Sequence, residues 1–140
     1  MKSHKKLVAM LLVVVLMIST CASALASTIT LGPGKSIPAS KRPIYAISSS
    51  PSYTISVTGK KGYKVTVYLD LYDSYETDST LQWKKSATKT ITCKNNVSVS
   101  ATISPTKTFK FVSGRTTKAR LRFTAAKANK GDVNVTYPTP

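Results

Sequence analysis

Strict alternation of apolar and polar side chains over ten residues is the feature that most restricts the fold of this chain. In residues 63–72, YKVTVYLDLY, every second side chain from Tyr63 to Leu71 is apolar, and the positions between them include Lys64 and Asp70. A period of two over this length predicts a β-strand with one buried face. Residues 118–125, KARLRFTA, repeat the pattern with an apolar face and a basic one.

Shorter runs of the same kind fill the rest of the chain and are separated by Gly, Pro, Asn and Lys clusters. Strands are expected near residues 28–31 and 44–48, with the proline-broken segment 32–43 as a loop or an edge. This spacing predicts an all-β protein, a single small antiparallel β-sandwich of about seven to nine strands. We expect it to be built from successive hairpins.

Four hairpins follow from requiring apolar faces to meet across each turn. The predicted partners are Val57 with Tyr63, Cys93 with Val97, Phe111 with Ala119, and Ala125 with Val133. The third hairpin makes residues 108–111 a strand and places Lys110 opposite Arg120. The turns require a positive φ at a glycine of residues 59–62 and at Asn96.

The first 26 residues have the layout of a secretory signal peptide: a basic head, an apolar run from residue 7 to 18, and small residues before a cut after Ala26. The apolar run is shorter than the roughly 18 residues that span a bilayer. We therefore expect residues 27–140 to form one secreted domain, in a layout that looks bacterial. Cys21 lies in an imperfect lipoprotein box, so a lipid anchor at that residue is the alternative.

Composition restricts the chemistry of the secreted domain. Three of the 21 Lys and Arg residues and none of the five acids precede the expected cut, which leaves 18 cations against five acids, a formal charge of +13. The only histidine is His4, in the leader, and Cys93 is the only cysteine that remains. Histidine-based hydrolysis and zinc catalysis are excluded on this inventory. We expect no enzyme activity, no cofactor and no internal disulfide, with Cys93 facing the core.

The basic face of residues 118–125 is the first candidate site. Lys118, Arg120 and Arg122 form an outward row about 13 Å long, which Lys110 joins if its predicted pairing is right. We expect this row to bind polyanions and to contribute little to folding. It lacks the interleaved aromatic residues of a nucleic-acid interface. The expected function is a non-catalytic protein retained at the cell envelope or extracellular matrix by an anionic polymer or membrane surface.

Three alternatives use other features. The aromatic residues beside residue 70 could form a sugar-stacking platform, as in a carbohydrate-binding module; they are Tyr68, Tyr72, Tyr75 and Trp83. The carboxylates clustered in residues 70–78 are a weak calcium candidate; they are Asp70, Asp73, Glu76 and Asp78. The net charge would also suit a secreted antibacterial or toxin-like protein that acts on anionic membranes.

Overall fold

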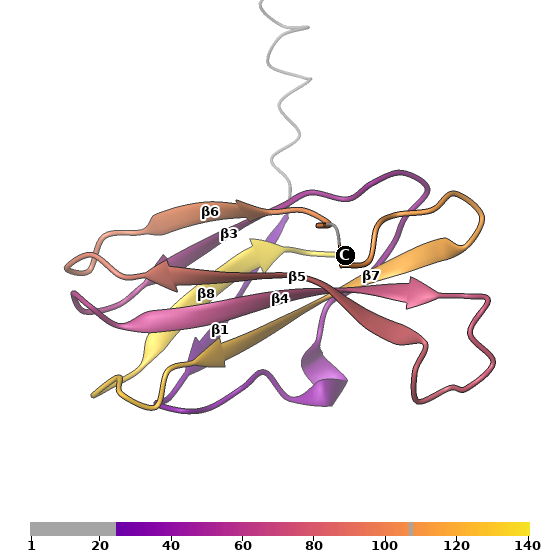
Figure 1. Ribbon diagram of the computed structural model, residues 1–140. Coiled ribbons are helices and arrows are strands. Elements are labelled where there is room, and N and C mark those ends of the chain that lie inside the picture. The colour runs from indigo at the N-terminus through magenta and orange to yellow at the C-terminus, as the bar shows by residue number, and fades with distance from the viewer. Residues whose placement is uncertain (1–24, 107) are drawn as a thin grey trace, which may run out of the picture.

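Eight strands and one short 3-10 helix make up the part of the chain that the computed structural model describes, residues 25–106 and 108–140 (Figure 1). Their bounds are β1 Ala26–Leu31, η1 Ala39–Lys41, β2 Ile44–Ala46, β3 Tyr53–Thr58, β4 Lys64–Asp73, β5 Trp83–Thr92, β6 Val99–Ile103, β7 Thr116–Ala125 and β8 Val133–Pro138. None of these elements is a helix long and apolar enough to cross a membrane. Residues 1–24 of the predicted leader, which include Cys21, lie outside the described residues.

The strands form two antiparallel four-stranded sheets packed face to face. Sheet A has the order β1-β8-β3-β6 and sheet B the order β2-β7-β4-β5. This interleaved order is that of an eight-stranded jelly roll. The predicted all-β sandwich and its number of strands are confirmed.

The predicted hairpins are wrong. The pairs 53–58 with 63–72, 87–94 with 97–104, and 118–125 with 133–135 each join strands of opposite sheets, and residues 108–111 are not a strand. Within the described chain, β4 and β5 are the one pair of consecutive strands that lie side by side, while the other connections cross between sheets. Apolar faces meet across the interior of a sandwich as well as between neighbouring strands of one sheet. The requirement that apolar faces meet therefore identified the buried faces but not the strand partners.

The alternating strands bury one face each, as their patterns predict. In β7, Ala119, Leu121 and Phe123 are fully buried, and β4 contributes Val65 and Leu69, also at 0% exposure. Each large apolar side chain removed from water in this way stabilises the fold by about 1.5–3 kcal/mol. Cys93 belongs to this core at 2% exposure, as expected, but its predicted neighbour Val97 is 61% exposed.

The turn residues behave as predicted even where the hairpins do not exist. Asn96 has a φ of 55° and Gly62 a φ of 87°. Both lie in arches, the loops that cross from one sheet to the other, and both arches use the left-handed conformation. The arch before β8 is fastened by the buried amide of Asn129. Its Oδ1 accepts a hydrogen bond from the Lys64 backbone N–H at 2.9 Å and its Nδ2 donates to the Lys64 carbonyl at 3.0 Å.

The outer faces of the two sheets differ in charge. The four strands of sheet A contain no charged residue, and their outward side chains are Ser, Thr and Asn that pair across strands, as Thr28 does with Thr136 at 2.9 Å and Ser56 with Ser100 at 2.7 Å. All charged strand residues belong to sheet B. The candidate site therefore lies on the outer face of sheet B.

Candidate polyanion-binding face

The basic row lies on the outer face of sheet B, as its alternation predicts. Strand β7 sits between β2 and β4, so each cation has a register partner on β4. Lys118 is opposite Tyr72, Arg120 opposite Asp70, and Arg122 opposite Tyr68. We call this surface of β2, β7, β4 and β5 the arginine face.

One carboxylate holds two of the arginines. Asp70 Oδ2 accepts hydrogen bonds from Arg120 Nε at 3.0 Å, Arg120 Nη2 at 2.8 Å and Arg122 Nε at 2.6 Å, and Oδ1 accepts from Arg122 Nη2 at 2.9 Å. The Asp70 side chain is only 2% exposed. Burial opposes its ionisation, but the hydrogen bonds and charges of Arg122 and Arg120 outweigh burial and lower the pKa of Asp70. Arg120 and Arg122 therefore contribute to folding, contrary to the expectation that the basic row contributes little.

Aromatic rings lie under the cations, which corrects the expectation that the row lacks interleaved aromatics. The Arg122 guanidinium lies 4.5 Å from the Tyr68 ring centroid, Arg120 lies 4.4 Å from Trp83, and the Lys118 ammonium lies 5.2 Å from Tyr72. Tyr72 and Trp83 contact each other edge to face at 5.2 Å. These are cation–π distances. The two predicted sites, the basic row and the aromatic platform, are thus one surface, without Tyr75.

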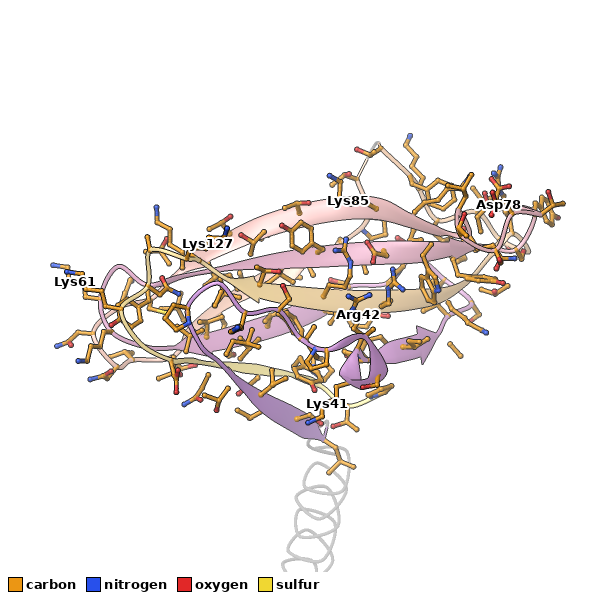
Figure 2. The ribbon with its side chains drawn as sticks, turned by 90° about the horizontal axis from the view of Figure 1, so that it is seen from below. Lys41, Arg42, Lys61, Asp78, Lys85 and Lys127 are labelled. Carbon is orange, nitrogen blue, oxygen red and sulfur yellow. The ribbon has the colours of Figure 1, made fainter. Side chains whose placement is uncertain are left out.

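Two more cations join the face from its flanks. Lys85, on β5, is exposed and opposite Asp70. Arg42 precedes β2 in extended conformation and is labelled beside β7 in Figure 2. Burial, and then the charges of Arg120 and Arg122, lower the pKa of Arg42. Sequence reasoning missed Arg42 because a loop of mixed composition carries no periodic signal.

Lys110 is not part of this face. It belongs to a loop, residues 108–115, and the residues opposite Arg120 are Asp70 and Ile44. The loop is fixed to the sandwich by a hydrogen bond from Ser86 Oγ to the Phe109 carbonyl. The predicted pairing of Lys110 with Arg120 is therefore wrong.

Three of the four clustered carboxylates, Asp70, Asp73 and Glu76, form ion pairs, and Asp78 does not. Asp73 is fully buried, and its Oδ1 and Oδ2 accept from Arg115 Nε at 2.7 Å and Nη2 at 2.6 Å. Lys84 Nζ lies 3.0 Å from Asp73 Oδ2 and 3.3 Å from Glu76 Oε2. Asp78 accepts from the Thr80 backbone N–H at 2.9 Å. In the described ranges, no three His, Cys, Asp or Glu side chains come together to hold a metal ion.

Tyr75 lies away from the other three aromatic residues, on the loop after β4. Its side chain is 70% exposed, and its ring centroid is 5.8 Å from the Arg115 guanidinium. The four rings proposed for sugar stacking are therefore not one platform.

A second basic region lies at one end of the sandwich. The loops around residues 34, 59–62, 94–96 and 126–131 meet there, because Gly59 bridges to Asn95 and Gly34 N–H bonds the Ala126 carbonyl. Figure 2 shows Lys61 and Lys127 at this end and Asp78 at the opposite one. The exposed lysines of this end, called the lysine end below, are Lys35, Lys60, Lys61, Lys94, Lys127 and Lys130.

Comparisons with known proteins assign neither a family nor a function to this chain. No family model matches the chain, and no curated protein matches it. The structure of infectious bursal disease virus, Gt strain, is similar at a TM-score of 0.44 and 12% identity, over 81% of this chain and 31% of the viral chain. A protein from Sulfurospirillum deleyianum is similar at a TM-score of 0.36 and 12% identity, over 81% and 98% of the two chains. The chain thus spans about a third of the viral protein that it resembles.

Proposed function

We propose that this is a secreted, non-catalytic binding protein that anionic polymers retain at the cell envelope or extracellular matrix, and that the arginine face is the binding surface. One observation carries the proposal. Four cations, Arg42 from the segment before β2 and Lys118, Arg120 and Arg122 from β7, share this face with the carboxylate of Asp70, which pairs with only two of them. The surplus positive charge is suited to an external polyanion.

Rigidity supports the same function. Asp70 and the aromatic rings hold the two guanidiniums in fixed positions, so little side-chain freedom remains to be lost when a ligand binds. Preorganised cations bind more strongly than flexible ones for this reason. The lysine end carries comparable charge on exposed loops, without such support.

The rings also weigh against the sugar-stacking alternative. A sugar stacks on a bare ring face, whereas a cation occupies one face of Tyr68, Tyr72 and Trp83. The rings serve here to hold cations. Polymer charge, rather than sugar stacking, is therefore the property that we expect the face to recognise.

The test compares two double variants that each remove two exposed lysines. Lys85→Gln with Lys118→Gln changes the arginine face, and Lys60→Gln with Lys61→Gln changes the lysine end. Binding to polyphosphate is measured between about 50 and 200 mM salt, the range over which contacts to phosphate weaken strongly. The face variant should bind more weakly, with a slope of log affinity against log salt reduced by about one to two units, and the end variant should change less.

Equal losses in both variants would mean that net charge alone governs binding, and the proposed face would be wrong. On intact cells, elution of the protein by salt supports the proposal. Elution by a neutral sugar would favour the carbohydrate-binding alternative instead. Leakage of anionic vesicles would favour the membrane-active alternative.

A further inference from the structure

One polar atom of the arginine face has no partner. The Nε of Arg42 is buried and makes no hydrogen bond to any residue of the described chain. An N–H group that is removed from water and left unpaired destabilises the folded state. Because this atom is closed to solvent, a ligand reaches Arg42 through the terminal nitrogens Nη1 and Nη2, which also make no hydrogen bond within the described residues.

Strand geometry places Arg42 next to Arg122. Ile44 is opposite Arg120 in the β2–β7 pairing, and Leu121 N–H bonds the Pro43 carbonyl at 3.2 Å, so the pairing continues before β2 begins. Residues two apart share one face of a strand. Arg42 is thus aligned with Arg122 on the outer face, one row from Arg120.

The hydrogen bonds to Asp70 leave one edge of each neighbouring guanidinium open. Arg120 and Arg122 both use Nε and Nη2 on Asp70, and neither Nη1 is hydrogen-bonded within residues 25–106 and 108–140. Three guanidiniums beside one carboxylate carry a local charge of +2. The repulsion between them adds to burial in lowering the pKa of Arg42.

From these contacts we propose that Arg42, Arg120 and Arg122 form a subsite for one phosphate group of the bound polyanion. A tetrahedral phosphate has enough acceptor oxygens, directed apart, to take donors from three arginines, whereas the two oxygens of a carboxylate are filled by two arginines, as at Asp70. The inference rests on the proposed function and specifies it: the ligand is a phosphate-bearing polymer or lipid rather than a carboxylate-bearing one.

Inorganic phosphate is the probe for the subsite. Thermal unfolding is followed as sodium phosphate replaces sodium chloride at constant ionic strength, with sodium acetate as the carboxylate comparison. Phosphate should raise the unfolding midpoint of the wild-type protein, because it binds only the folded state, and acetate should not. In Arg42→Gln, affinity for phosphate should fall about tenfold or more, since hydrogen bonds to charged groups are the strong ones.

Two further variants separate geometry from charge. Arg42→Lys keeps the charge but not the fork, so it should lose most of the phosphate response, and Lys60→Gln at the lysine end should keep all of it. Should Arg42→Gln fail to fold, the Nε–Hε resonance of Arg42 in the wild-type protein gives the same information. It should shift on addition of phosphate and stay in place with acetate.

Equal phosphate responses in wild type, Arg42→Gln and Arg42→Lys would overturn the subsite, as would an unmoved Arg42 resonance. The proposed function fails separately, if polyphosphate binding ignores the Lys85 and Lys118 substitutions. The source of the phosphate is resolved by comparing phosphatidylglycerol vesicles with polyphosphate at equal phosphate concentration. Tighter binding to vesicles assigns a lipid headgroup, and tighter binding to polyphosphate assigns a polymer.

Discussion

Removing both arginines that hold Asp70 should destabilise the protein, even though they lie on an outer face. In Arg120→Gln with Arg122→Gln, the carboxylate, which is 2% exposed in the wild type, loses all four hydrogen bonds from the guanidiniums. Breaking a buried ion pair from one side costs about 3–5 kcal/mol. Because the arginine side chains are 18% and 29% exposed, water offsets part of this loss, and about 3 kcal/mol is expected.

Chemical denaturation measures this loss directly, and thermal unfolding should show a midpoint lowered by roughly 12 °C at about 4 °C per kcal/mol for a domain of this size. Adding Asp70→Asn to the double variant should restore most of the stability, since a neutral amide needs no counter-charge. The triple variant has no buried charge, so any stability that it does not regain measures the packing lost with the two arginine side chains.

The pH dependence should change sign between the two proteins. In the wild type the pKa of Asp70 is lowered, so its contribution to stability is present above about pH 4 and is lost as the pH falls through the folded-state value. In the double variant the two guanidiniums no longer offset burial, which raises the pKa of Asp70, so the deficit in stability should shrink as acid protonates Asp70. A double variant as stable as wild type, or one that Asp70→Asn does not rescue, would refute the reasoning.

Three other outcomes are expected. Asp73→Asn should lower the free energy of unfolding by about 3 kcal/mol, because Asp73 is fully buried against Arg115; a loss under about 0.5 kcal/mol in denaturation would contradict this role. Cys93→Ser should cost about 1–3 kcal/mol by burying a hydroxyl without a partner and leave polyphosphate affinity unchanged; weaker binding at unaltered stability would make Cys93 a functional thiol. Mass spectrometry of the secreted protein should find Ser27 at the amino terminus, whereas an acylated Cys21 there would establish the lipid anchor.

Alternation along the chain was enough to predict which side chains face the core. The inward face of Leu121 and Phe123 and the outward face of Arg120 and Arg122 follow from a period of two, and the structure confirms both. The local backbone conformation could also be predicted, since Asn96 tolerates the positive φ that its loop requires.

The same pattern could not predict which strands pair with one another. A period of two states which face of β4 is buried, but β7, more than 40 residues away, becomes its partner only when the jelly roll closes. The role of Asp70 depends on that partnership. A carboxylate that looked like part of a metal-binding loop became the anchor of two arginines because β7 and β4 lie side by side.

The lysine end has a consequence for how the molecule meets a charged surface. The ten residues of β4 separate it by about 30 Å from the loop that carries Glu76 and Asp78, where Lys84 and Arg115 balance the carboxylates. Unequal charge at the two ends gives the domain an electric dipole moment along its strands. In the field of a negative surface such a body turns before it touches, and the lysine end leads. Under the proposed function, the first encounter would therefore be end-on, and the arginine face would engage only after the domain had rotated onto its side.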